Sequence, residues 1–185
     1  MDPGGEQYRL FLAGDDGAMA EIIRLYQKSL LLYLNTLVGN IHTAEDLTED
    51  TFVKLVTKKP KFRGDASFKT WLFAIGRRTA LDHLRRQRQK PPLSIHDYGD
   101  LLASDDDPTY SYEQQERIAT LRRVMYTLPP AYRQVLWLVY FEDCSHKKAA
   151  TVMGKSVHSI DTLIYRARQA LKIRLEQEGI SSEDL

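Results

Sequence analysis

The stretch that decides the fold is SHKKAATVMGKSVHSIDTLIYRARQALKIRL, residues 145–175. Its spacing predicts a short helix over 145–153, a turn at Gly154, where glycine adopts a positive φ without steric cost, and a longer second helix. Ser156 and Ser159 are both suitable N-caps for this second helix. The pattern is that of a helix-turn-helix, which places its second helix in the major groove of DNA.

The second predicted helix carries side chains suited to DNA. Arginine binds phosphate, or the two major-groove acceptors of guanine, in a forked geometry. An apolar stripe at helical spacing is expected to face the core. For Tyr165 the pattern allows either packing against the core or contact with DNA, and for the arginines the plainer alternative is surface charge. The candidate DNA contacts from the residues alone are Ser159, Thr162, Tyr165, Arg166 and Arg168.

Composition excludes several classes of protein. The chain has 185 residues, of which 43% are hydrophobic, enough for one ordinary domain or two small ones with a packed core. No apolar run approaches the roughly 20 residues that span a bilayer, and the start MDPGGEQYRL lacks a secretory pattern. Cys144 is the only cysteine, so no intrachain disulfide is possible, and we expect it to be a small buried residue. These features predict a cytoplasmic protein.

Charge is strongly segregated along the chain. Residues 58–90 hold eleven Lys or Arg against two acids, and residues 146–174 hold seven against one. Between them, residues 91–116 hold seven acids and no Lys or Arg. Two basic blocks separated by an acidic spacer predict two modules that bind polyanions on one tether.

Helical periodicity extends over nearly all of the chain. Helices are predicted over 19–38, from an N-cap at Thr43 to 57, from a cap at Ser67 to about 89, over 113–126, and over 130–141. The loop 60–66 contains Pro, Gly and Asp. The predicted fold is all-α, with two small helical domains, 1–90 and 113–185, joined by a flexible acidic linker, 91–112. The helix-turn-helix belongs to the second domain.

The first basic block interleaves cations with aromatic rings, a mixture that suits single-stranded nucleic acid. Phe62 lies in the predicted loop and is expected to touch a base. Trp71 is in phase with the apolar stripe and is expected to belong to the core. The candidate contacts of this block from the residues alone are Lys61, Phe62, Arg63, Arg77 and Arg78.

Catalytic constellations are not found in the sequence. The five histidines show no metal-binding spacing such as HExxH, and no glycine-rich phosphate loop is present. We therefore expect a protein that is not an enzyme, with no cofactor, no metal site and no small-molecule substrate.

Three segments, taken in order, resemble the extracytoplasmic-function type of bacterial RNA polymerase sigma factor, a branch of the sigma-70 family. AEDLTEDTFVKLVTK (44–58) resembles the acidic helix that in this family docks on the polymerase. FRGDASFKTWLFAIGRRTALDHLRR (62–86) resembles its promoter-melting segment, and LPPAYRQVLWLVYFEDCSHKKAATVMGKSVHSIDTLIYRARQALK (128–172) its −35-binding domain. The resemblance covers about 17–179 and implies that the domains 1–90 and 113–185 are sigma regions 2 and 4.

The resemblance also implies functions and partners. The function would be promoter-specific initiation with core RNA polymerase, which is held through its β′ clamp helices and β flap. The loop 62–67 would take a flipped-out −10 base, and an anti-sigma factor, in some cases at the membrane, would inhibit the protein. The implied polymerase contacts are Asp46, Glu49, Asp50, Phe52 and Leu55; the −10 contacts are Lys61, Phe62, Arg63, Ser67, Arg77 and Arg78; the −35 contacts are Ser159, Asp161, Thr162, Tyr165, Arg166 and Arg168.

Two residues depart from the family pattern. Asp161 stands where a basic residue is usual; an acid repels phosphate, or accepts a hydrogen bond from cytosine N4, which predicts an altered −35 preference. Lys148 replaces a glutamate that would complete a capping box with Ser145, so Ser145 is expected to cap its helix alone. Two other classes fit parts of the sequence: a polymerase-independent helix-turn-helix regulator and a helical scaffold that binds only proteins.

Overall fold

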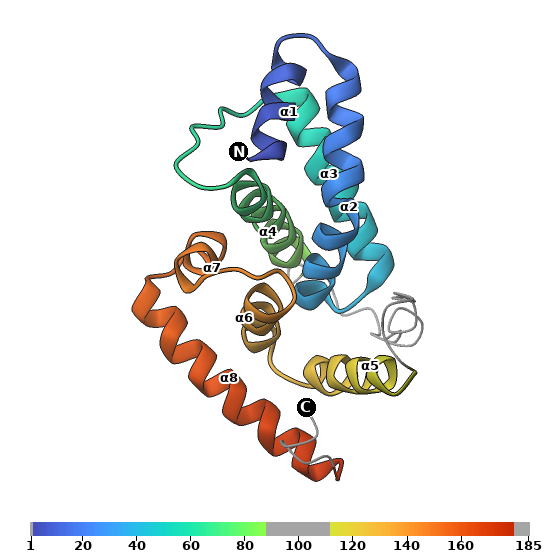
Figure 1. Cartoon of the computed structure of the whole chain (residues 1–185), viewed down its shortest axis with the longest axis vertical. Coiled ribbons are helices and arrows are strands. Elements are labelled where there is room, and N and C mark those ends of the chain that lie inside the picture. The colour runs from blue at the N-terminus through green and yellow to red at the C-terminus, as the bar shows by residue number, and fades with distance from the viewer. Residues whose placement is uncertain (1, 88–111, 180–185) are drawn as a thin grey trace.

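The computed structural model describes residues 2–87 and 112–179, and within them every regular element is a helix, as predicted (Figure 1). The elements are α1 (Pro3–Leu12), α2 (Asp16–Val38), α3 (Ile41–Lys58), α4 (Phe68–Gln87), α5 (Tyr112–Tyr126), α6 (Pro130–Tyr140), α7 (His146–Met153) and α8 (Val157–Gln177). The predicted linker lies outside the described residues, apart from Tyr112. The domain boundaries at 90 and 113 remain a prediction.

The N-terminal helices α1–α4 are organised around α2. This helix contacts α1, α3 and α4, and its buried stripe includes Ile22, Leu30 and Leu34. Gly76 of α4 faces it so closely that an added Cβ would lie 2.8 Å from Leu30 Cδ1. Glycine therefore permits the close crossing of α2 and α4, which fixes the direction in which α4 leaves the loop before it.

The C-terminal helices contain the predicted helix-turn-helix. The Ser145 hydroxyl accepts a hydrogen bond from Lys148 N at the start of α7, and Gly154 ends that helix in the left-handed region, at φ 62°. Ser156 caps α8 by accepting from Ser159 N, which decides between the two candidate caps. The buried stripe of α8, including Ile160, packs on α6 and α7.

The two groups of helices share one hydrophobic core. Helix α6 packs on α2, and α7 packs on α4; we call these two helix pairs the closed contact. Six consecutive residues of α6, 133–138, are buried, because α2 covers the face that α8 leaves free. Figure 1 shows α8 on the opposite side of the C-terminal helices from α1–α3. The sequence did not predict this contact.

Three helix starts differ from the predicted ones. Helix α1 was not predicted. Helix α2 begins at Asp16 rather than at 19, since Asp15 caps it by accepting from Gly17 N. Helix α3 begins at Ile41, and its cap is Asn40, whose side chain accepts from Thr43 N, rather than Thr43 itself.

Candidate nucleic-acid interface

The outer face of α8 gathers most of the residues predicted to contact DNA. Tyr165 is 67% exposed, so of its two possible roles the packing role is wrong. Thr162 lies one turn before Tyr165 and Arg166, and Ser159 one turn before Thr162, which puts them on adjoining parts of the exposed surface. Arg168 is also exposed and lies on the opposite flank of Tyr165. The helix thus offers an aromatic ring between two guanidinium groups.

Asp161 is paired with a residue of the preceding helix. Its Oδ1 lies 2.6 Å from Nδ1 of His146, the first residue of α7, and both side chains are about half exposed. The pair ties the two helices of the helix-turn-helix together. When His146 is protonated, its charge also offsets the negative charge of Asp161. The sequence alone did not indicate that His146 is the partner of Asp161.

The loop before α4 carries the second group of candidate residues. Phe62 is half-buried against Phe68 and Trp71, with ring centroids 5.5 and 5.2 Å apart, whereas Lys61 and Arg63 are exposed. Trp71 packs against the core, as expected. A pocket of about 620 Å³ lies between this loop and α1. Its volume is within the range of roughly 300–1,000 Å³ that is typical of sites for small ligands.

The remaining candidates of the first basic block, Ser67, Arg77 and Arg78, have different surroundings in the structure. Ser67 caps α4, because its hydroxyl accepts a hydrogen bond from Thr70 N at 3.3 Å. Arg78 is exposed, but Arg77 Nε donates to Gln134 Oε1 of α6 at 3.0 Å. This hydrogen bond joins α4 to α6, and it engages Arg77 but not Arg78.

The structure exposes only some of the α3 residues that were predicted to contact the polymerase. Asp46, Glu49 and Asp50 are exposed, but Phe52 and Leu55 are buried in the core, so their side chains do not reach the surface. The helical period instead places Val53 and Val56 beside the acids, and both are exposed, Val53 by 55%. The sequence already contains this signal, because Val53 and Val56 lie one or two helical turns after Asp46 and Glu49 and therefore on the same face of the helix.

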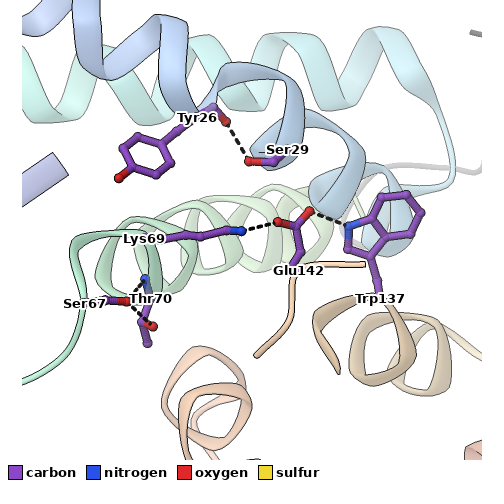
Figure 2. A network of polar contacts seen from close by, with 7 residues as sticks. All are labelled: Tyr26, Ser29, Ser67, Lys69, Thr70, Trp137 and Glu142. Carbon is purple, nitrogen blue, oxygen red and sulfur yellow. Dashed lines mark hydrogen bonds and ion pairs between the residues drawn. The ribbon is translucent and has the colours of Figure 1, made fainter. Parts of the chain in front are cut away.

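An ion pair between a partly exposed lysine and a buried glutamate joins the two groups of helices (Figure 2). Lys69 Nζ of α4 lies 2.6 Å from Glu142 Oε2, in the turn between α6 and α7, and Trp137 Nε1 donates to Glu142 Oε1 at 3.0 Å. The Glu142 side chain is only 5% exposed. Burial raises the pKa of Glu142 above its usual range, although Lys69 and Trp137 act in the opposite direction.

Two further polar contacts cross between the groups of helices. Arg133 of α6 donates from Nε to the carbonyl oxygen of Thr36 at 2.9 Å, and this bond is buried. Asn35 Nδ2 donates to the Tyr126 hydroxyl at 2.9 Å. The carbonyl of Thr36 belongs to the last turn of α2, where no intrahelical partner exists, so Arg133 satisfies it.

Cys144 is buried in the same region, as expected, and burial raises the pKa of its thiol. Among residues 2–87 and 112–179, no group of three or more His, Cys, Asp or Glu side chains is placed to hold a metal ion. No helix in these residues combines the length and the apolar character needed to cross a membrane.

Comparison with known proteins identifies two segments. Residues 22–90 match the family described as Sigma-70 region 2, and residues 118–171 match Sigma-70, region 4, which leaves α1 outside both matches. RNA polymerase sigma factor YlaC of Bacillus subtilis is 30% identical over 84% of this chain and 90% of its own length. The extracytoplasmic-function (ECF) sigma factor SigW of the same organism is 25% identical over 88% of this chain and 91% of its own.

A solved structure shares the fold. It is that of the sigma factor RpoE from Bartonella quintana in complex with the anti-sigma factor NepR, with a TM-score of 0.63 and 23% identity over 85% of this chain and 96% of that chain.

Proposed function

The chain belongs to the sigma-70 family, in its extracytoplasmic-function group, and is an RNA polymerase sigma factor; from this premise we propose which of its surfaces meet the polymerase and the promoter. The observation that carries the proposal is the presence of three exposed surfaces on one chain: the outer face of α8, the pocket beside the loop 60–67, and the acidic face of α3. Family membership disfavours a regulator that acts without polymerase.

The outer face of α8 is proposed to bind the −35 element. The exposed Arg166 and Arg168 supply forked donors for phosphate or guanine, and Tyr165 stands between them. Ser159 and Thr162 extend the face toward the helix start. Asp161, held by His146, favours a base that donates a hydrogen bond, such as cytosine through N4.

The loop and α4 are proposed to bind the melted −10 element. Lys61, Arg63 and Arg78 are exposed cations for the single-stranded backbone, and the half-buried ring of Phe62 offers a face on which a base can stack. Extracting a base from the duplex costs a few kcal/mol, so a pocket that captures it would help to drive strand opening. Ser67 caps α4 beside this site, and it is proposed to act by fixing the start of that helix.

The acidic face of α3 is proposed to dock on the core polymerase at the β′ clamp helices, with region 4 on the β flap. Asp46, Glu49 and Asp50 supply charge that attracts a basic partner. The exposed valines Val53 and Val56 supply apolar area at the centre of the face, in place of the buried Phe52 and Leu55. We further propose that an anti-sigma factor covers these surfaces, and that the protein works in the cytoplasm, released from that partner.

Binding both promoter elements at once requires the closed contact to open. The −10 and −35 elements lie about 25 base pairs apart, or roughly 85 Å along B-form DNA at 34–36 Å per turn. In the closed contact α4 and α7 touch. We therefore propose that α6 and α7 separate from α2 and α4 before, or together with, promoter binding.

Transcription with purified core enzyme tests the proposal. Core polymerase plus this protein is expected to initiate from matched promoters selected out of a randomised library. The double substitution Arg166→Ala and Arg168→Ala is expected to reduce initiation. It should also reduce the slope of the logarithm of the DNA-binding constant against the logarithm of salt concentration, by about one unit for each lost phosphate contact. Absence of both stimulation and core binding by the folded protein would overturn it. Tight duplex binding by the free protein, with no polymerase effect, would favour the independent regulator.

A further inference from the structure

Helix α1 holds the loop 60–67 at three places. At the start of the loop, the Tyr8 hydroxyl donates to the carbonyl oxygen of Pro60 at 2.9 Å. At its end, the Asp2 carboxylate accepts a hydrogen bond from Phe68 N, the first residue of α4. In the middle, Gly5 lies against Phe62, where an added Cβ would be 2.9 Å from Cε1 of the ring.

These contacts explain why the start of α1 has the sequence Pro-Gly-Gly. An added Cβ on Gly4 would lie 2.4 Å from Phe68 Cδ1 and 2.5 Å from the Tyr26 hydroxyl, both on buried side chains. Two glycines disfavour a helix in isolation, by about 1 kcal/mol each relative to alanine. They are tolerated here because they let α1 approach the aromatic cluster of Phe62, Phe68 and Tyr26, and Pro3 suits the first helical turn.

The same helix forms one wall of the pocket. Glu6 and Arg9 of α1 line it opposite Arg63 and Asp65 of the loop. Both are exposed, and within the described part of the chain neither side chain takes part in a hydrogen bond or ion pair. The pocket thus has an aromatic wall together with one acidic and one basic side chain that make no hydrogen bond or ion pair to the described residues. This combination matches the mixed hydrogen-bond donors and acceptors on the edge of a nucleobase.

We propose that α1 is part of the site that captures the unpaired −10 base, with Glu6 and Arg9 reading the edge of that base and with Asp2 and Tyr8 positioning the loop. This inference rests on the proposed function, because it takes the pocket beside the loop as the base site. Glu6 accepts from exocyclic amino groups, and Arg9 donates to ring nitrogens and carbonyl oxygens. Promoter choice at this base then depends on a helix that lies outside both matched family segments.

The experiment measures initiation by the complete holoenzyme on four promoters that differ only in the captured base, located first by scanning 2-aminopurine through the −10 element. Glu6→Gln and Arg9→Ala are expected to change the relative rates on the four bases by roughly five- to hundredfold, the range for loss of one good contact to a base edge. Glu21→Gln and Arg24→Ala, an exposed pair on α2, are matched controls with the same charge changes and an expected effect below about twofold.

The positioning role has its own readout. Asp2→Ala and Tyr8→Phe are expected to reduce the 2-aminopurine signal of the captured base, and Asp2→Asn, which keeps an acceptor for Phe68 N, restores much of it. A purely stabilising role would lower the melting temperature and leave the four-base profile unchanged.

The outcomes separate the inference from the proposed function. If Phe62→Ala alters the four-base profile but Glu6→Gln and Arg9→Ala do not, the pocket captures a base and the inference about α1 is wrong. If Phe62→Ala also leaves the profile unchanged in an active holoenzyme, the pocket is not the base site and the inference falls with it. If the wild-type protein fails to initiate at all, the proposed function fails.

Discussion

Replacing Lys69 with alanine is expected to open the closed contact. Lys69 is the ion-pair partner of Glu142, whose side chain is only 5% exposed. With Lys69 removed, the closed state holds a buried carboxylate that keeps only the Trp137 donor. In the open state the same carboxylate is hydrated, so the substitution destabilises the closed state selectively.

The magnitude follows from the geometry of the pair. A hydrogen bond to a charged group contributes about 1.5–3 kcal/mol, and the Lys69 side chain is 35% exposed, so solvent screening reduces the figure to roughly 1–2 kcal/mol. At 1.36 kcal/mol per factor of ten, the ratio of open to closed molecules rises by roughly five- to thirtyfold.

Cys144 provides the assay without any added label. Its thiol is buried in the closed contact, near enough to Lys69 and Tyr33 for charge on one to affect the others, and burial raises its pKa. A thiolate reacts and a buried thiol does not. The rate of modification by an aromatic disulfide reagent at low reagent concentration therefore reports the open fraction, and it is expected to rise five- to thirtyfold in Lys69→Ala.

Substitution of a lysine outside the closed contact provides the control. Lys172→Ala removes an exposed lysine of the same kind, paired with Glu176 at 3.8 Å on α8, and should change the rate less than twofold. Loss of Lys69 also removes a charge that lowers the pKa of Cys144, an effect that slows reaction in the closed state and cannot mimic opening. Equal rates for wild type and Lys69→Ala, with both folded, would refute the reasoning.

Three further predictions concern stability and docking. Because burial raises the pKa of Glu142, the closed contact is most stable below the ordinary carboxyl pKa and weakens as pH rises through the raised value; small-angle scattering should show this expansion in the wild type and not in Glu142→Gln. Gly76→Ala brings a methyl group against the fully buried Leu30 and should lower the free energy of unfolding by about 1–3 kcal/mol in urea titrations. Val53→Asp should weaken binding to core polymerase by roughly tenfold without changing the melting temperature, whereas Phe52→Ala should destabilise the fold by about 3–5 kcal/mol.

The helix-turn-helix was predictable because its signals are local. Ser145 and Gly154 set one helix and Ser156 starts the next, each through contacts within four residues. Helix α1 was not predictable, because the reason for Gly4 and Gly5 is the proximity of Phe68 and Phe62, more than fifty residues away. Local propensity alone favours a loop there.

The closed contact was hidden for a different reason. Arg133 and Gln134 are polar residues that a pattern places on the surface, yet both are buried, because α2 and α4 supply their partners. Similarly, Phe52 was assigned to the polymerase surface from family resemblance, although helical phase puts it inside. Because these residues are polar and are covered by a second group of helices, the spacing of apolar residues in the sequence does not indicate that they are buried.

The closed contact also links opening to DNA binding through charge. In the closed state Lys69 is neutralised by Glu142, and Arg77 donates to Gln134, so two cations of α4 are withheld from the surface beside the loop. Separation of α6 and α7 frees both cations, on the helix that also carries the exposed Arg78. Polyanionic DNA interacts more strongly with the open state, in which these cations are free, and it must therefore shift the equilibrium toward that state. Under the proposed function, promoter DNA therefore competes for the surface that keeps the two halves together.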